Sequence, residues 1–362
     1  MGDAIPVFPE ADPHHPEWQE TPIIPLDLSP EGYGELYVKN EADRTSNPTG
    51  TIKDRAAWEL ATLYRDFARA LYFKLRLGRL TKEELKNIPV PRLSFMTSGN
   101  EGRAVAERFK LHDLPPPKLI VSQDILPAYL ESLKVLRADL YAVDLDEALD
   151  SDAIRCVSNN EGGIDITSVR SLQPQAIFYD WHVHESFNFS PDKIFVPYGS
   201  GRLAENYLYW QMRTMRNEGN NTRDPRLKAH VGHVVSMDIL AAEPSSPTSV
   251  ADKLTAPFKP FLLFKDSDIN ALTLMNFTGR GTSKNPVSES SIDEAFALLK
   301  SRGIRAEPSG AASLALYLTH FRLGLIGRKE KILVVNTGEG LFDPHQMVRE
   351  FVEETLSESG EK

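Results

Sequence analysis

Several features are scarce in this sequence, and each scarcity excludes a class of protein. Cys156 is the single cysteine among 362 residues, so no disulfide can form within the chain. That suits a reducing compartment, and we expect a cytoplasmic location. No apolar run has the length of a membrane span, so we expect no membrane partner. Residues 1–20 have neither the basic region nor the apolar stretch of a secretory signal, and we expect none there.

Positive charge is also in short supply. The chain has 41 Lys and Arg residues against 51 Asp and Glu, a formal net charge of −10, so we expect no broad binding to nucleic acid. Hydrophobic residues make up 41% of the chain and charged residues 25%, which is typical of an ordinary globular protein. Its length allows one large domain or two ordinary ones with sizeable cores.

What the sequence does have is a lysine at the junction of a turn and a helix. Lys53 follows the turn Pro48-Thr49-Gly50, and residues 54–61 have the pattern of the first turns of a helix. A lysine held at such a junction can be aimed at a small electrophile, and aldehyde cofactors such as pyridoxal phosphate need an amine fixed in this way. Taken alone, the segment fits an ordinary solvated lysine equally well.

A second segment combines small and polar residues between a strand pattern and a helix pattern. Thr97-Ser98-Gly99-Asn100-Glu101-Gly102 follows the apolar run Leu93–Met96 and precedes the helical pattern Arg103–Leu111. Free backbone N–H groups and the helix dipole make such a helix start a site for anions. A plain helix cap would explain the same residue types.

A third segment repeats this arrangement with glycines. The strand pattern Ile194–Tyr198 leads into Gly199-Ser200-Gly201, and a helical pattern follows from Arg202 through Met212. Glycines let the backbone approach a phosphate closely, and successive N–H groups form a concave anion site. A lone Gly-x-Gly is also what a plain turn contains.

Two further segments lie near the C-terminal end. Glu307–Ala315 is a turn that leads into a helix of small residues, which can pack tightly against a neighbour. Ile332–Asn336 has the pattern of a buried strand, and Thr337-Gly338-Glu339-Gly340 follows it as a glycine turn.

Together these five segments, in this order, resemble the fold-type-II pyridoxal phosphate enzymes, the tryptophan-synthase-β-like family of threonine synthase, cysteine synthase and the serine/threonine dehydratases. The resemblance implies that Lys53 carries the Schiff base with the cofactor and later acts as the acid/base. It implies that the loop Thr97, Ser98, Gly99 and Asn100 binds the substrate carboxylate, with Asn100 also beside the ring oxygen of the cofactor.

The resemblance assigns the remaining cofactor contacts as well. The phosphate group would lie in a cup made by Gly199, Ser200, Gly201, Arg202 and Leu203. Arg202 stands where the family usually has a second consecutive glycine, which alters the geometry or the charge of the cup. Thr337 would bond the pyridine nitrogen, while the helix after Glu307 would be mainly architectural.

The fold is expected to be α/β. Strand patterns at 93–96, 119–121 and 140–143 alternate with helical patterns at 103–111 and 126–137, which predicts a parallel sheet. The resemblance implies two domains, each an open, mostly parallel twisted sheet flanked by helices. The large cofactor-binding domain would comprise residues 1–88 and 192–362, and the small mobile domain residues 89–191. The cofactor would bind between them, at the carboxyl ends of strands.

Four functions remain open. The lysine segment, Glu307–Ala312 and Thr337–Leu341 favour a threonine-synthase-like lyase that converts O-phosphohomoserine and water to threonine and phosphate. Thr97–Gly102 is closer to cysteine synthase, which performs β-replacement on an activated serine, and Glu339 replaces the His that is usual in threonine synthases. A serine/threonine dehydratase or ammonia-lyase is the third alternative, and a non-catalytic cofactor-binding protein the fourth. The resemblance also implies a small amino-acid substrate and a homodimer.

Three other segments need an interpretation. The helical stretch 58–77, with Tyr64, Phe67, Leu71 and Leu75 on one face, could pack in the core, contact a second subunit or support a lid. His182-Val183-His184 would place both rings on one face of a strand, but no third ligand is evident, so we expect no metal site. The loop 278–285 is most simply a connection.

Overall fold

Helices and strands alternate along most of the chain, which is the α/β class that the sequence predicts. The computed structural model describes residues 19–29, 32–97, 99–123, 125, 127–144, 156, 159, 163–166, 179–199, 201–217, 225–255 and 284–340. The strands are β1 (Ile23–Pro25), β2 (Leu36–Asn40), β3 (Arg92–Met96), β4 (Lys118–Ser122), β5 (Asp139–Val143), β6 (Gly163–Asp165), β7 (Lys193–Pro197), β8 (Asp238–Pro244), β9 (Lys284–Val287) and β10 (Ile332–Asn336). The helices are α1 (Lys53–Arg76), α2 (Lys82–Lys86), α3 (Asn100–Leu111), α4 (Pro127–Val135), α6 (Asp180–Asn188), α7 (Arg202–Asn217), α8 (Pro225–Ser236), α9 (Asp252–Thr255), α11 (Glu289–Ser301) and α12 (Pro308–Arg322).

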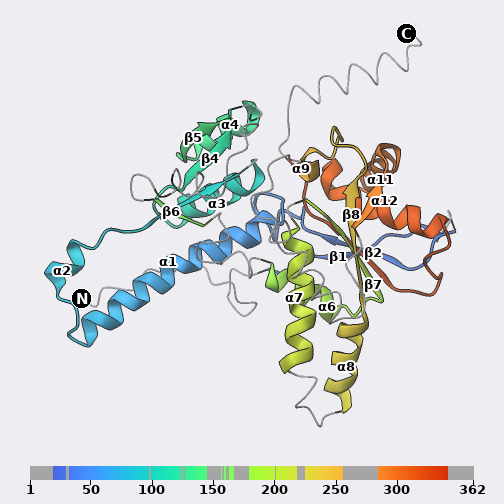
Figure 1. The fold of residues 1–362 in the computed structure, drawn as a ribbon, viewed down its shortest axis with the longest axis horizontal. Coiled ribbons are helices and arrows are strands. Elements are labelled where there is room, and N and C mark those ends of the chain that lie inside the picture. Colours follow the sequence, from blue (N-terminus) through green and yellow to red (C-terminus); the bar gives the residue numbers. More distant parts are fainter. Residues whose placement is uncertain are drawn as a thin grey trace, which may run out of the picture.

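The described strands form two sheets. One has six strands in the order β1-β2-β10-β7-β8-β9, in which only the edge pair β1–β2 is antiparallel. The other has four parallel strands in the order β5-β4-β3-β6. Figure 1 shows the four-stranded sheet with α3 and α4 on one side of the molecule and the six-stranded sheet on the other. The expected architecture of two open, mostly parallel sheets flanked by helices is confirmed.

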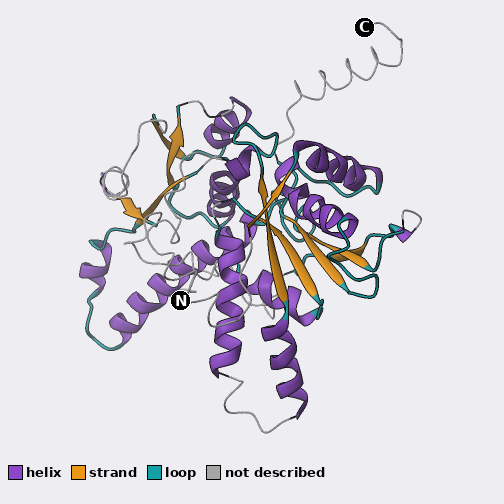
Figure 2. Ribbon diagram, turned by 45° about the vertical axis from the view of Figure 1, so that its right-hand side comes forward, coloured by secondary structure: helices purple, strands orange, loops and turns teal. Residues whose placement is uncertain are grey.

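Both faces of the six-stranded sheet are covered by helices (Figure 2). On β7, Ile194 and Val196 pack in one core cluster, which includes residues of α7, while Phe195 packs in the other, which includes residues of α12. The side chains of β10 alternate between the two core clusters in the same way, and all residues of this strand are buried. Because successive side chains of a strand point to opposite faces, a strand covered on both faces must be apolar throughout. This explains the continuous apolar runs at 194–196 and 332–335.

Helix α1 connects the two sheets. It begins at Lys53, and its first half is buried, with Leu60 and Tyr64 in the same core as Phe95 of β3 and Phe109 of α3. The later half projects away from both sheets toward α2 (Figure 1), and Phe73 on it is 59% exposed. The predicted helix is therefore confirmed, and it starts at Lys53 itself, one residue before the helical pattern that begins at 54.

The strand interpretation of His182-Val183-His184 is wrong, because this segment lies in α6. Residues two apart on a helix do not share a face, and the two rings have different surroundings. His182 is buried between Glu41 and Tyr207, with Nδ1 2.6 Å from Glu41 Oε1 and Nε2 2.9 Å from Tyr207 Oη. His184 lies against the ring of Trp210.

Within the described ranges, no group of three or more His, Cys, Asp or Glu residues is placed to hold a metal ion. Likewise, among the helices that the structure describes, none is long and apolar enough to span a membrane. Residues 278–283 of the loop 278–285 lie outside the described part of the chain.

Candidate active site

The segments that the sequence singles out lie at the carboxyl ends of parallel strands. Thr97 follows β3, Gly199 follows β7 and Thr337 follows β10. In open α/β sheets this edge is where ligands bind. The lysine loop joins this edge of the six-stranded sheet, because the Ile52 N–H donates to the carbonyl oxygen of Thr337 at 2.8 Å and the Glu339 N–H donates to that of Gly50 at 3.1 Å. The loop before Lys53 and the turn after β10 are thus bound to each other.

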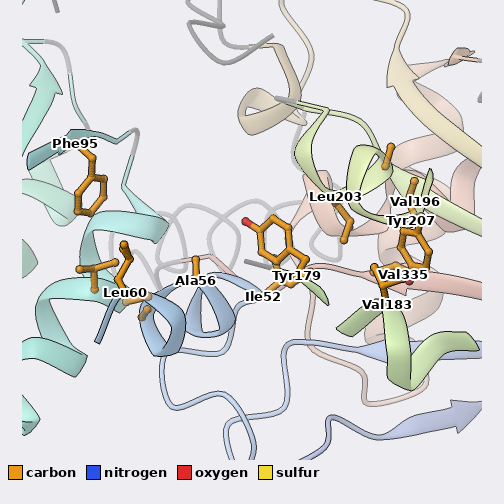
Figure 3. Close-up of a cluster of buried hydrophobic side chains, with 14 of the residues drawn as sticks. Ile52, Ala56, Leu60, Phe95, Tyr179, Val183, Val196, Leu203, Tyr207 and Val335 are labelled. Atoms are coloured by element: carbon orange, nitrogen blue, oxygen red, sulfur yellow. The ribbon is translucent and has the colours of Figure 1, made fainter. Parts of the chain in front are cut away.

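Lys53 is the first residue of α1, and its amine has two partners from distant segments. Nζ lies 2.9 Å from Tyr179 Oη and 3.1 Å from Glu101 Oε2. Figure 3 shows Tyr179 beside Ile52 and Ala56 in the core near the start of α1. Burial alone lowers the pKa of Lys53, but the Glu101 carboxylate and the Tyr179 hydroxyl outweigh it and raise the pKa. The amine is therefore an ammonium at neutral pH.

The loop after β3 is closed by its own threonine. Thr97 Oγ1 accepts hydrogen bonds from the N–H groups of Gly99, at 3.2 Å, and Gly102, at 2.9 Å. Gly99 has φ +142°, and a Cβ there would lie 2.6 Å from the Tyr129 ring, so only glycine fits. The Thr97 hydroxyl therefore holds the start of α3, although the N-cap position itself is Gly99, which has no side chain to form a cap. Ser98 lies outside the described residues.

Asn100 begins α3, and both the oxygen and the nitrogen of its side-chain amide are hydrogen-bonded. Oδ1 accepts from Tyr129 Oη at 2.6 Å, and Nδ2 donates to Glu307 Oε1 at 3.2 Å. Burial raises the pKa of Glu307 to about 7, although nearby Lys253 opposes the shift. The orientation of Asn100 thus depends on a carboxyl group that titrates near neutral pH.

The glycine loop after β7 is close-packed and leads directly into a long helix. A Cβ on Gly199 would lie 3.1 Å from the carbonyl oxygen of Lys253. Gly201 has φ +85°, and a Cβ there would lie 3.0 Å from Tyr198 Oη. Helix α7 begins at the next residue, Arg202, so its free N–H groups and dipole lie at the ligand edge of the sheet. Ser200 lies outside the described residues.

The two residues after the glycine loop have different surroundings. Leu203 is buried in the core that α7 shares with β7, so its backbone N–H is what it can offer an anion. Arg202 is half-buried. Burial raises the pKa of Tyr179, and the positive charges of Lys53 and, more weakly, of Arg202 oppose that rise. Arg202 therefore adds positive charge on the side of Lys53.

The helix after Glu307 packs tightly on the turn after β10, as its small residues predict. A Cβ on Gly310 would lie 2.5 Å from Asn336 Oδ1. The Glu307 N–H donates to the carbonyl oxygen of Gly338 at 2.8 Å. Helix α12 thereby fixes both the Thr337 turn and the backbone of Glu307.

Glu339 braces the lysine loop. It forms ion pairs with Arg44 and with Arg305, the latter at 3.2 Å. A Cβ on Gly50 would lie 2.6 Å from Glu339 Oε1, so the carboxylate rests directly on the turn before Lys53.

Sequence reasoning missed several residues of this site. The sequence pattern indicates only an architectural role for Glu307, although an acidic residue at the start of a helix of small buried residues is a usable signal. Glu101 lies in the loop motif Thr97–Gly102, but the sequence pattern assigns it no function. Tyr179 has no local signal, because it lies 126 positions from Lys53 and only the fold brings it there.

Known proteins were compared with the chain, and no family model matches it. It is similar to the threonine synthase of Bacillus sp. (strain ULM1), with 24% identity over 335 residues, covering 90% of this chain and 83% of that protein.

Among solved structures, it resembles diaminopropionate ammonia lyase from Escherichia coli in complex with D-serine, with TM-score 0.63 and 15% identity over 94% of this chain and 89% of that one. It also resembles a pyridoxal 5'-phosphate-dependent aspartate racemase, with TM-score 0.60 and 14% identity over 91% and 92% of the two chains. At these identities the likeness is one of fold, and it is the fold-type-II fold that the sequence predicts.

Proposed function

We propose that this chain, which has the fold of the fold-type-II pyridoxal phosphate enzymes, is itself such an enzyme and acts on a small amino acid. The observation that carries the proposal is one shared site between the two sheets. Asn100 follows a strand of the four-stranded sheet, while the N-terminus of α7 and the Thr337 turn follow strands of the six-stranded sheet. The contacts of Lys53 with Glu101 and of Asn100 with Glu307 bring these carboxyl ends together. An amine, a phosphate site and two polar groups are the set that this cofactor requires.

The residues present fit pyridoxal phosphate. Its phosphate suits the loop of Gly199, Ser200 and Gly201, where a Cβ on Gly199 or Gly201 would be in tight contact and the N-terminus of α7 follows. The backbone of Arg202 and Leu203 would complete the cup. Lys53 would bond the aldehyde carbon, Asn100 would lie at the ring oxygen, and Thr337 at the ring nitrogen. When bound, the cofactor supplies the electron sink that lets a bond at the substrate's α-carbon break.

The chain's own groups would bind the substrate and move its proton. The N–H groups at the start of α3 and the loop Thr97, Ser98, Gly99 and Asn100 would hold the substrate carboxylate. The Lys53 amine, once free of the cofactor, would take the proton from the α-carbon. We propose that residues 1–88 and 192–362 form the large domain and residues 89–191 the small mobile one. The Asn100–Glu307 hydrogen bond would then join the two domains at the site.

The reaction we propose is elimination or replacement at Cβ or Cγ, with conversion of O-phosphohomoserine and water to threonine and phosphate as the first candidate. The similarity to a threonine synthase over 90% of the chain supports it. The second candidate is an ammonia-lyase or dehydratase reaction. Two observations favour it: the fold neighbour that is an ammonia lyase, and Glu339, which is engaged with Arg44 and Arg305 where threonine synthases usually have His. β-Replacement on an activated serine is the third candidate.

The test is a visible spectrum of the purified protein with pyridoxal phosphate, followed by additions of single substrates. We expect an absorption band that is absent in Lys53→Ala and that changes with one class of amino acid. Phosphate release from O-phosphohomoserine identifies the first reaction, 2-oxo acid from serine or threonine the second, and sulfide consumption with O-acetylserine the third. A band that no amino acid changes would leave a non-catalytic binding protein. A protein that shows no band at all would refute the proposal.

A further inference from the structure

Glu101 contacts the amine of Lys53 from a different helix. Lys53 is the first residue of α1 and Glu101 the second residue of α3, and these helices pack together through the core. Glu101 Oε2 lies 3.1 Å from Lys53 Nζ, and the two side chains are 24% and 30% exposed. The pair is thus partly withdrawn from water, with the buried hydroxyl of Tyr179 on the other side of the amine.

The helix dipoles favour a contact between these two side chains. A carboxylate in the first turn of α3 is stabilised by the positive end of the helix dipole. The ammonium of Lys53 lies at the same end of α1, which disfavours it unless an anion is close. The Asp54 carboxylate is engaged elsewhere, because it accepts from the hydroxyl and the N–H of Thr49. Glu101 is therefore the carboxylate that faces the amine, with Tyr179 as its neutral partner and Arg202 acting through Tyr179.

This arrangement poses a chemical problem for Lys53. The amine must be neutral to add to an aldehyde or to take a proton from a substrate carbon. A proton that leaves Nζ for another side chain needs an acceptor within hydrogen-bond reach. Among the described groups that influence its charge, Glu101 is the one anion in direct contact.

We propose that Glu101 is a catalytic residue that exchanges a proton with the Lys53 amine, so that the two side chains together form the acid–base unit of the site. The inference rests on the proposed function. The Cα–H bond of the amino-acid substrate would break, its electron pair would stay on the substrate with the cofactor supplying the electron sink, and an N–H bond would form on Lys53. A proton then passes from Nζ to Oε2, which restores a neutral amine and leaves a carboxylic acid, and it returns by the reverse path.

The alternative is an ion pair that only fastens α3 to α1. Such a pair would also shift the titration of Lys53, but its removal would not slow proton exchange at the substrate. Two measurements on Glu101→Gln are therefore needed: the titration of Lys53 tests the contact itself, and proton exchange at the substrate separates the two readings. Glu107→Gln is the matched control, because Glu107 lies on the same helix and is exposed.

The first measurement uses the protein without cofactor. Wild type and variants react with a limiting amount of acetic anhydride at a series of pH values, and mass spectrometry quantifies acetylation of the Lys53 peptide. In Glu101→Gln we expect half-maximal reactivity at a pH lower by about one unit or more, the usual effect of losing an adjacent opposite charge. Glu107→Gln should titrate like the wild type, and Glu101→Asp should lie between the two. An unchanged midpoint in Glu101→Gln overturns the proposal.

The second measurement follows exchange of the substrate α-hydrogen in deuterium oxide with the cofactor loaded. We expect exchange to fall about 10²-fold in Glu101→Gln, the lower end for loss of a general acid–base group, with cofactor absorbance retained. Exchange at the wild-type rate would overturn the catalytic role even if the lysine titration shifts. The two proposals fail differently: a wild type that takes up no cofactor refutes the proposed function, whereas a loaded Glu101→Gln that exchanges normally refutes only this inference.

Discussion

Replacement of Glu41 by Gln is expected to destabilise the fold strongly, because Glu41 is the centre of a fully buried ionic network. It follows β2 and is completely shielded from solvent. Its carboxylate accepts from Thr21 Oγ1 at 2.6 Å, Asn47 Nδ2 at 2.7 Å and Arg55 Nε at 3.2 Å, and it lies 2.6 Å from His182 Nδ1. Asn47 begins the lysine loop, so the network also anchors the segment that positions Lys53.

The size of the effect follows from the charges that remain. Without Glu41, the guanidinium of Arg55 keeps Glu185, at 2.7 and 2.8 Å, but Lys39 shares that carboxylate at 2.6 Å. Two buried cations would then have one anion. Removing one member of a buried pair costs about 3–5 kcal/mol. The amide of Gln would also point donor hydrogens at groups that are themselves donors.

The assay is the free energy of unfolding in urea, without cofactor and near pH 7.5. The control is Glu294→Gln, which breaks an exposed pair with Arg322 and should cost about 0–1 kcal/mol. The reasoning is refuted if Glu41→Gln loses no more stability than this control.

The pH dependence of the same network has a definite sign. Burial lowers the pKa of His182, so the unfolded chain binds its proton first and stability falls as the pH drops below about 6.5, the ordinary histidine value. Burial opposes ionisation of Glu41, but Arg55 and His182 outweigh it and hold its pKa well below the ordinary 4.5. Its stabilisation is therefore present above about 4.5 and is lost at lower pH. Glu41→Gln should lack this second, more acidic loss.

Further predictions concern the loop after β3 and the carboxyl group beside Asn100. Gly99→Ala places a Cβ against Tyr129 at a φ that other residues avoid, and should lower the free energy of unfolding by about 1–3 kcal/mol. The control is Gly232→Ala, whose added Cβ meets nothing within 4 Å. Equal effects of the two substitutions on the free energy of unfolding would contradict this geometry. Glu307→Gln should gain stability relative to the cofactor-free wild type, by about 1–3 kcal/mol, as the pH rises from 4.5 to about 7. In that window the folded protein holds a proton that the unfolded chain releases, so the wild type loses stability while the variant does not; parallel urea profiles would show that Glu307 ionises normally.

Much of the fold is predictable because local patterns and burial agree. β7 and β10 are covered on both faces, so their apolar runs mark them as central strands. The turn Pro48-Thr49-Gly50 ends irregular structure where α1 begins, which places Lys53 at the helix start.

The remainder depends on contacts that no local pattern encodes. His182-Val183-His184 alternates like a strand, yet the segment is helical because its apolar and charged residues pack against α7, Glu41 and Arg55. Lys39 and Glu185 are charged residues that a sequence reading leaves on the surface, and only their mutual pairing buries them. Tyr179 and Glu307 reach the site through the fold, from segments far from Lys53 and Asn100.

In the proposed function, Lys53 bonds the aldehyde of pyridoxal phosphate. The direct test is reduction of the mixture of protein and cofactor with sodium borohydride, followed by mass spectrometry of the peptides. We expect stoichiometric phosphopyridoxyl label on the Lys53 peptide and its loss in Lys53→Ala. Label that is scattered over surface lysines, or that is equally abundant in the variant, would contradict the account.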